Sequence, residues 1–182
     1  MCDNYRPISL LNIGYKLFAI ILLDRLRSAG AEDRLWSTQF GFRRQRGTVD
    51  ALFVARRLIE DVWARRDGKA ILLALDWAKA FDSVSPEALA KALYRFGCPP
   101  QFVSIIEAIY SRRSFVVTDS GATSHRRGQA YGISQGCPLS PFLFVILMTV
   151  LLHDVRESLE CNGVRRSSEL VVHDLVYADD TL

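Results

Sequence analysis

The stretch LVVHDLVYADD, residues 170–180, places two adjacent carboxylates at the end of a mostly apolar run. The length and β-branched content of this run predict a strand from Leu170 to Tyr177 that leads directly into Asp179 and Asp180. A second run, AILLAL at residues 70–75, is continuously apolar and ends at Asp76. Such a run is typical of a strand that is buried on both faces. Each of the two predicted strands therefore ends on acidic side chains.

The remaining apolar patterns predict a mixture of helices and short strands. Helices are expected over residues 13–28, from Thr48 to about Arg66, from the Ser85-Pro86-Glu87 start signal to Gly97, around residues 102–109, and from Pro141 to about Leu159. Strands are expected at residues 115–118 and 125–130, separated by a turn at residues 120–121. Because helices and strands do not alternate regularly, the pattern indicates an α+β domain.

The composition favours a single globular unit with an arginine bias. The 182 residues are 49% hydrophobic, which is enough for one core, with or without a smaller lobe. Of the 23 basic residues, four are Lys and nineteen are Arg, many of them in adjacent pairs such as Arg56-Arg57 and Arg112-Arg113. Arginine binds phosphate through a planar fork, which favours a nucleic-acid or nucleotide partner. Solvated helix faces would account for the same bias.

Several function classes are disfavoured by the sequence. The four cysteines are widely separated, so neither a zinc site nor a disulfide framework is expected. The longest apolar run, residues 142–152, is shorter than the roughly 20 residues that span a bilayer. No signal peptide is expected, because residues 2–7 are polar. We therefore expect an intracellular protein, in the nucleus, the cytoplasm or both, with no membrane partner.

The carboxylates Asp76, Asp179 and Asp180 indicate a cation site if their strands are neighbours. Acids at the edge of a core repel one another unless an opposite charge balances them. Carboxylate oxygens suit Mg²⁺, and two such ions form the clamp used in phosphoryl transfer. Taken alone, an Asp-Asp pair after a strand is most often a solvated turn, and Asp76 or Asp82 could each cap a turn.

Five segments, in order along the chain, resemble the fingers and palm of reverse transcriptases, most closely those of non-LTR (LINE-like) retrotransposons. They are NYRPISLL at 4–11 followed by Lys16, QFGFR at 39–43 with RGTVDA at 46–51, LDWAKAFD at 75–82, GISQGCPLSP at 132–141 and YADD at 177–180. The resemblance implies fingers over about residues 1–68 and palm over 69–182, with an antiparallel palm sheet backed by helices. The family continues beyond the last motif into a thumb, so a partial domain without the thumb is expected.

The resemblance also implies roles at the carboxylates. Asp76 and Asp179 would hold two Mg²⁺ ions, with Mn²⁺ as a possible substitute, and Asp180 would assist. The backbone carbonyl of Trp77 would also face a metal, although smaller side chains are common at that position in the family. Phe81 falls where the family places a steric gate against the ribose 2′-hydroxyl; a plain core aromatic is the alternative.

Further residues are implied to contact the substrates, which would be dNTPs, an RNA template and a DNA primer. Gln135 and Gly136 would lie beside the incoming nucleotide and the template. Lys16, Arg43 and Arg46 would bind the triphosphate, and Arg6, Tyr177 and Pro138 would contact template or primer.

Three functions remain open from the sequence. The first is an RNA-directed DNA polymerase. The second is a retroelement remnant without catalysis that binds nucleic acid through its arginines. The third, an RNA-dependent RNA polymerase, is disfavoured because Phe81 would block a ribonucleotide. The sequence does not indicate an oligomeric state.

Overall fold

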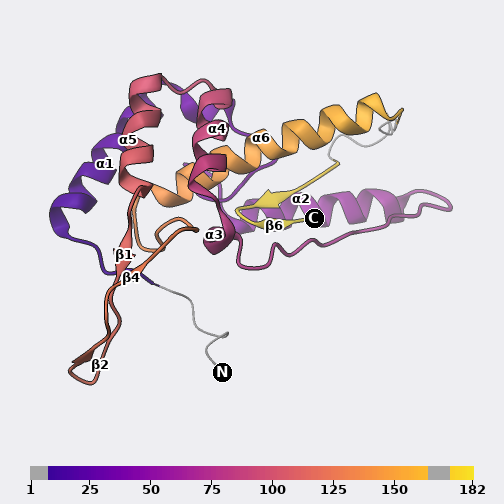
Figure 1. The fold of residues 1–182 in the computed structure, drawn as a ribbon. Helices are drawn as coiled ribbons and strands as arrows, with labels where there is room; N and C mark the ends of the chain where they lie inside the picture. Colours follow the sequence, from indigo (N-terminus) through magenta and orange to yellow (C-terminus); the bar gives the residue numbers. More distant parts are fainter. Residues whose placement is uncertain (1–7, 164–172) are drawn as a thin grey trace.

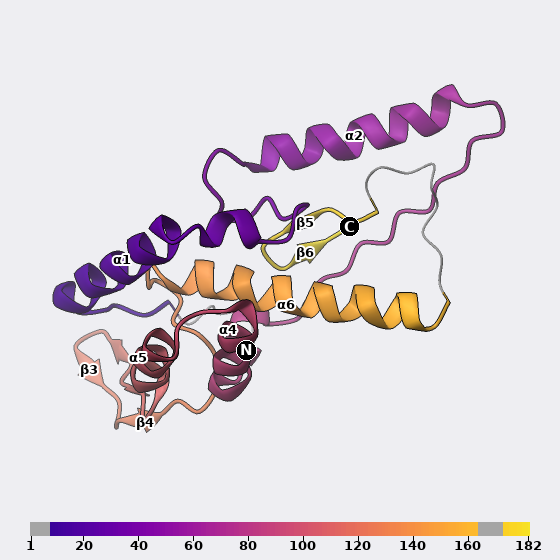
Figure 2. The ribbon, with the colours of Figure 1, turned by 90° about the horizontal axis from the view of Figure 1, so that it is seen from above.

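In the computed structural model, which describes residues 8–163 and 173–182, the core forms around one long apolar helix, α6 (Ser140–Cys161). Helices α1 (Ile13–Ser28), α4 (Pro86–Phe96) and α5 (Pro100–Tyr110) surround its N-terminal half (Figures 1 and 2). Side chains from all four helices form one buried cluster, with Phe142 and Leu143 at its centre. The predicted long helix is confirmed as this central element.

The helix ends follow signals that are visible in the sequence. Helix α4 begins at Ser85, whose hydroxyl accepts from the Ala88 backbone N–H, and has proline in its first turn. It ends at Gly97, which adopts a φ of 89°. Helix α1 begins similarly, with the Asn12 side chain accepting from the Gly14 N–H at 2.7 Å. These boundaries agree with the sequence predictions.

Helix α2 (Thr48–Ala64) lies apart from α4 and α5, on the far side of the β5–β6 hairpin (Figure 2). Its cap is Gly47 rather than the predicted Thr48, and the Asp50 carboxylate accepts from the Gly47 N–H at 2.7 Å. The side chains of Leu52 and Trp63 on this helix are exposed, although Val62 is buried. Two short helices, η2 (Ala31–Arg34) and α3 (Ala80–Ser83), complete the helical elements of the described residues.

The described strands form three small antiparallel pairs. Strands β1 (Ser114–Phe115) and β4 (Arg127–Gly128) pair, and β2 (Thr118–Asp119) pairs with β3 (Ala122–Thr123) in an arm that extends from the body (Figure 1). Strand β5 (Val176–Tyr177) pairs with β6 (Asp180–Thr181). Helices with small antiparallel sheets agree with the predicted α+β class. Residues 170–172 of the predicted 170–177 strand lie outside the described residues.

The prediction that residues 70–75 form a buried strand is wrong. Only Leu75 pairs, through an antiparallel bridge to Thr181, and the side chains of Ile71, Leu72 and Leu73 are exposed. The register explains the difference. Leu75 lies opposite Thr181, and among the described residues those from Ala70 to Ala74 pair with no strand. An apolar run becomes a buried strand only where a neighbouring strand is present to pair with it.

None of the helices in the described residues combines the length and apolar character needed to cross a membrane.

Candidate active site

The acidic ends of the two predicted strands meet across one antiparallel bridge. The Leu75 N–H donates to the Thr181 carbonyl at 2.7 Å, and the Thr181 N–H donates back to Leu75 at 3.2 Å. This register places Asp76 directly opposite Asp180, where cross-strand side chains share one face of the pair. Asp179 lies in the two-residue turn between β5 and β6. The condition that the sequence left open, that these two segments are neighbours, is met.

The Asp179 turn is held by a buried glutamine, Gln39, which is the first residue of the QFGFR segment at 39–43. Gln39 is fully buried, and its Oε1 accepts from the backbone N–H groups of Gly41 and Ala178, each at 2.8 Å. Its Nε2 donates to the Ala178 carbonyl at 3.3 Å. Ala178 itself adopts a φ of 59°, an uncommon conformation for a residue with a Cβ. Gln39 therefore stabilises the strained residue that immediately precedes Asp179.

Gly41 permits this close approach between the loop and the turn. A Cβ atom at Gly41 would overlap the backbone nitrogen of Ala178. The loop also pairs with β5 directly, because the Phe40 N–H donates to the Val176 carbonyl at 2.7 Å and the Val176 N–H donates to Thr38 at 3.0 Å. The turn that carries Asp179 is thus supported from the 38–41 loop on one side and from β6 on the other.

A cavity of about 660 Å³ lies in front of the three carboxylates. Its lining residues come from the three motif segments at residues 75–82, 132–141 and 177–180, together with Phe42 from the N-terminal region. The lining residues are Phe42, residues 76–82, residues 134–136, Pro141 and residues 177–180. One cavity is therefore lined by eight of the predicted site residues: Asp76, Trp77, Phe81, Gln135, Gly136, Tyr177, Asp179 and Asp180.

The donor chemistry of this cavity suits a divalent cation. Asp76 and Asp180 are exposed and Asp179 is half-buried, so their oxygens are accessible from the cavity. Within residues 8–163 and 173–182, no group of three or more His, Cys, Asp or Glu side chains is placed to hold a metal ion. Mg²⁺ is usually bound through only one or two protein carboxylates, with waters and substrate phosphates as the remaining ligands. The residues present fit that mode of binding.

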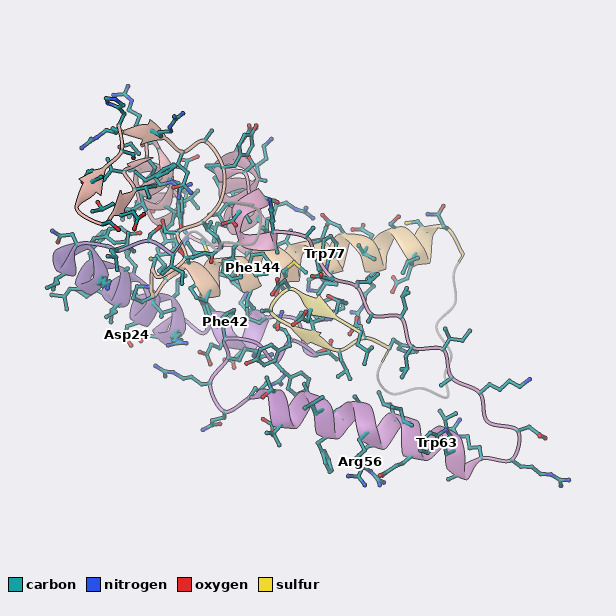
Figure 3. All side chains as sticks on the ribbon, turned by 90° about the horizontal axis from the view of Figure 1, so that it is seen from below. Asp24, Phe42, Arg56, Trp63, Trp77 and Phe144 are labelled. Carbon is teal, nitrogen blue, oxygen red and sulfur yellow. The ribbon has the colours of Figure 1, made fainter. Side chains whose placement is uncertain are left out.

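Phe81 forms one wall of the cavity and also packs against the core. Its ring stacks on Phe144 with centroids 4.4 Å apart and planes 17° from parallel. The Phe42 ring meets it edge-on at 6.2 Å. Figure 3 shows Phe42, Phe144 and Trp77 converging on the region of the β5–β6 hairpin, with Trp63 remote on α2. The ring of Phe81 is therefore fixed in place at the cavity wall.

Gly136 lies where a side chain has no room. It adopts a φ of 105°, and a Cβ atom there would come within 2.7 Å of the Ser9 carbonyl oxygen. The preceding residue, Gln135, accepts from the Ser9 N–H through its backbone carbonyl at 2.8 Å. These contacts fix the loop over residues 132–136 against the N-terminal segment, with Gln135 at the cavity edge.

Comparison with known protein families identifies the family of this chain. A family model described as reverse transcriptase (RNA-dependent DNA polymerase) matches residues 2–182. The chain belongs to the reverse transcriptase family. The predicted resemblance to reverse transcriptases of non-LTR retrotransposons is confirmed.

Three relatives illustrate the relationship of this reverse transcriptase chain to longer proteins. The transposon TX1 149 kDa protein of Xenopus laevis is 31% identical over 100% of this chain and 14% of its own length. A Pol polyprotein from the element R2 of Popillia japonica is 29% identical over 99% of the chain and 25% of its own length. The RNA-directed DNA polymerase from the mobile element jockey of Drosophila funebris is 31% identical over 98% and 19%. The chain thus spans at most a quarter of these relatives.

The basic residues predicted to bind triphosphate lie outside the cavity that the three carboxylates line. Arg43 donates to the carbonyls of Trp36 at 3.1 Å and Glu32 at 3.0 Å, and burial lowers the pKa of its guanidinium. Arg46 donates to the Gln39 carbonyl at 3.2 Å and lies over the Phe40 ring. Lys16 is half-buried on α1 and does not line the cavity. In this structure the two arginines stabilise the 36–40 loop, and a contact with triphosphate stays a prediction.

Three other predicted contacts differ in their placement. Pro138 lines a second cavity of about 320 Å³, which shares Phe42 and Pro141 with the first and is also lined by Arg27, Arg43 and Arg44. Arg6 lies outside the described residues. The Trp77 backbone carbonyl accepts from the Ala80 N–H at 3.1 Å, and the Trp77 indole N–H contacts the Thr181 hydroxyl at 3.4 Å. A metal contact through that carbonyl stays a prediction.

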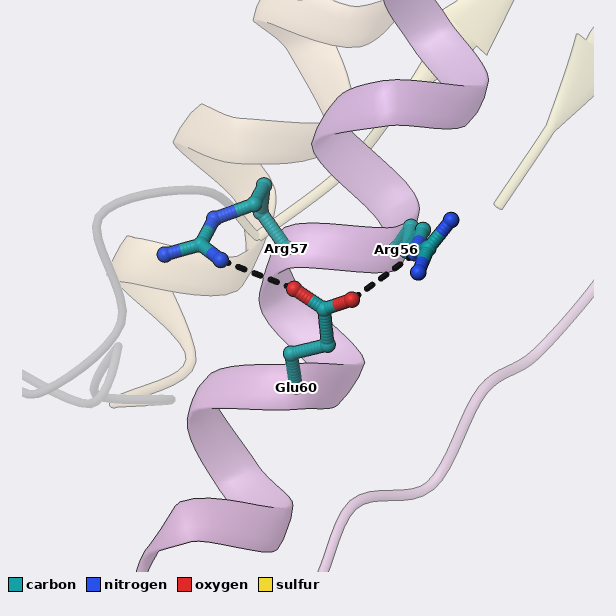
Figure 4. Close-up of polar contacts among 3 residues, drawn as sticks. All are labelled: Arg56, Arg57 and Glu60. Carbon is teal, nitrogen blue, oxygen red and sulfur yellow. Dashed lines mark hydrogen bonds and ion pairs between the residues drawn. The ribbon is translucent and has the colours of Figure 1, made fainter.

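The paired arginines on α2 are already engaged by an acidic side chain. Arg56 and Arg57 both bond to the Glu60 carboxylate, at 2.7 and 2.8 Å (Figure 4). These bonds, from Arg56 first, lower the pKa of Glu60. Exposed pairs of this kind are weak. They nevertheless show that adjacent arginines do not by themselves mark a phosphate site, as the solvated-face interpretation of the sequence allowed.

A partly buried arginine that sequence reasoning missed supports the loop at residues 131–134. Arg113 lies over the Tyr110 ring at 4.5 Å, and its guanidinium donates to the carbonyls of Tyr131 and Gly132 and to the Ser134 hydroxyl. Burial lowers the pKa of Arg113 and raises that of Tyr110. The sequence showed only an Arg112-Arg113 pair and did not indicate that Arg113 would be partly buried while Arg112 is exposed.

Proposed function

We propose that this chain carries the active site of an RNA-directed DNA polymerase that adds dNTPs to the 3′-hydroxyl of a DNA primer on an RNA template. One observation carries the proposal: the antiparallel bridge between Leu75 and Thr181 places Asp76 opposite Asp180, with Asp179 in the adjoining turn, and all three line one cavity. A reverse transcriptase fold around this cavity supports the same reaction.

The three carboxylates are the residues that would hold two Mg²⁺ or Mn²⁺ ions. When bound, such ions lower the pKa of the attacking hydroxyl and stabilise charge on the transferring phosphate and on the leaving pyrophosphate. Asp76 and Asp179 would bind the ions, and Asp180 would add negative charge beside them. Gln39 holds the backbone of Ala178, and this would fix the backbone position from which the Asp179 side chain reaches the ions.

Phe81 would exclude ribonucleotides from the cavity. Its ring lies on the cavity wall five positions after Asp76 and is stacked on Phe144, so it cannot easily rotate away. A fixed ring would clash with a ribose 2′-hydroxyl while leaving a deoxyribose unhindered. Phe81 can pack against the core and also act as a steric gate, because its ring contacts the core and still borders the cavity.

The central test compares primer extension by the wild type and by Asp179→Asn on a primed RNA template with dNTPs and Mg²⁺. Loss of the carboxylate charge should lower extension by roughly 10²–10³-fold. Asp24→Asn is a matched control, since Asp24 is exposed on α1, apart from the cavity residue Trp77 (Figure 3). Equal extension by the wild type and Asp179→Asn would contradict the proposal.

A second function, nucleic-acid binding without catalysis, corresponds to the other outcome of this test. The exposed Arg44 beside the second cavity favours such binding, because its guanidinium forms no hydrogen bond or ion pair with another described residue. Absence of extension together with salt-sensitive RNA binding that Asp179→Asn leaves unchanged would support this function.

The gate is tested by offering ribonucleotides to Phe81→Ala. Removing the ring should raise ribonucleotide incorporation relative to dNTP incorporation by about tenfold or more, as expected for a steric barrier of at least 1.4 kcal/mol. Phe115→Ala, on the exposed arm, is the aromatic control. An unchanged ratio in Phe81→Ala would show that Phe81 is only a packing residue.

A further inference from the structure

A side-chain hydrogen bond joins two of the cavity-lining segments. The amide nitrogen Nε2 of Gln135 donates to Oδ1 of Asp82 at 2.9 Å, across 53 positions of sequence. Both side chains are half-buried and both line the main cavity. Asp82 follows Phe81 directly, and on sequence alone it was explained as a residue capping a turn. Its carboxylate instead contacts a residue expected to lie beside the nucleotide.

The backbone around this bond is held independently of it. The Ile133 N–H donates to the Phe81 carbonyl at 2.8 Å, and the Gly132 N–H donates to the Val84 carbonyl at 2.7 Å. A Cβ atom at Gly132 would come within 3.0 Å of the Asp82 Cα atom, so the two segments are in close contact. The backbone bonds therefore keep the segments together, and the Asp82–Gln135 bond chiefly determines the orientation of the Gln135 amide.

The chemistry of the pair decides that orientation. An ionised carboxylate only accepts hydrogen bonds, so Asp82 selects the nitrogen side of the amide. The amide oxygen Oε1 of Gln135 is then directed away from Asp82, and it accepts no hydrogen bond from the described part of the chain. Without Asp82 the amide could turn over and present either its oxygen or its nitrogen to the cavity.

We infer that Asp82 is a positioning residue, which orients the Gln135 amide so that its oxygen accepts a hydrogen bond from the bound nucleotide. The complementary group on the nucleotide is a donor, either a sugar hydroxyl or a base amino or imino group. The inference rests on the proposed polymerase function, because it requires that a nucleotide occupies this cavity. Asp82 itself contacts Gln135 and acts on the nucleotide through it.

Single-nucleotide extension kinetics with four variants test the coupling. Asp82→Leu removes the acceptor at similar volume, and Asp82→Asn keeps an oxygen that accepts from Gln135. Asp82→Leu should raise the KM for dNTP about tenfold with a smaller change in kcat, and Asp82→Asn should stay within about threefold of the wild type. In a Gln135→Leu background, Asp82→Leu should have no further effect.

Two results of these kinetics would overturn the inference. One is an equal, additive effect of Asp82→Leu in the presence and absence of Gln135. The other is an Asp82→Asn variant as impaired as Asp82→Leu. A purely structural role would lower the urea midpoint without producing this coupling, so unfolding curves are measured on every variant.

A spectroscopic measurement needs neither activity nor a folded Asp82→Leu variant. In the wild type, the side-chain NH₂ protons of Gln135 should exchange with solvent at least about tenfold more slowly than those of the exposed Gln101. Equal exchange rates would overturn the inference. A wild-type protein that extends no primer yet shows the slow exchange would count against the proposed polymerase function while supporting the contact that orients Gln135.

Discussion

Two apolar runs in this chain end on acidic residues, but one of them is buried and the other is exposed. Val176 in β5 is fully buried, whereas Ile71, in the run before Asp76, is 96% exposed. Strand β5 has backbone partners on both sides, the 38–40 loop and β6. The run before Asp76 has a single bridge, at Leu75. The difference shows that burial of a strand depends on its neighbours, and apolar composition alone does not secure it.

The carboxylates Asp179 and Asp76 also differ in the contacts that hold their backbone in place. Asp179 follows a turn that Gln39 and Gly41 hold from a distant loop. Asp76 follows an exposed segment and is positioned by the bridge from Leu75 to Thr181 and by the bonds of the adjacent Trp77. We therefore expect mutations around β5 to be costly and mutations in residues 70–74 to be nearly neutral. Unfolding measurements on variants of the two regions test this contrast.

The largest effect is expected for Gln39→Leu. The change leaves the buried N–H groups of Gly41 and Ala178 and the Ala178 carbonyl without their partner, at about 1–3 kcal/mol each. The free energy of unfolding, measured with urea, should fall by about 4 kcal/mol. Gln101→Leu, at an exposed position on α5, should change it by less than about 0.5 kcal/mol. Similar values for the two variants would show that the buried contacts of Gln39 contribute little.

Gly41→Ala should be the next most damaging change. The added methyl group would overlap the Ala178 backbone, and forcing the loop away from β5 should cost about 3 kcal/mol in unfolding free energy. Gly128→Ala is the control, because nothing lies within 4 Å of a Cβ atom at that position. If Gly41→Ala unfolds at the wild-type urea concentration, the loop and the turn do not pack as tightly as described.

The smallest effects compare the two apolar runs directly. Val176→Ala should lower the unfolding free energy by about 2 kcal/mol, because it removes buried methyl groups. Leu73→Ala should lower it by less than about 0.5 kcal/mol, since this side chain is exposed. Both values come from urea unfolding curves of the same chain. A large loss for Leu73→Ala would mean that residues 70–75 are buried in solution, as the sequence alone had suggested.

Local signals predicted the helices well. The Ser85-Pro86-Glu87 start and the Gly97 end act through hydrogen bonds and backbone angles within a few residues, so they can be identified without knowing the fold. The cap of α2 shifted by one residue to Gly47 because the Asp50 carboxylate bonds to its N–H. Such shifts are common at helix ends.

Long-range contacts account for what sequence reasoning missed. Gln39 and Ala178 are 139 positions apart, and Asp82 and Gln135 are 53 apart. No periodicity or cap pattern relates residues at such separations. The hydrogen bonds of Arg43 and Arg46 could not be predicted either. The carbonyls that accept them are brought within reach only by the path of residues 32–39 in the folded chain.

The sequence by itself determined the order of the motifs, the family, the helices and the identity of the three carboxylates, since these depend on residue type and on local spacing. The tertiary structure alone decided that Asp76 faces Asp180, that residues 70–74 stay exposed, and that Gln39 and Asp82 support the site. The physical reason is that strand pairing and buried hydrogen bonds need two partners, and the second partner lies far away along the chain.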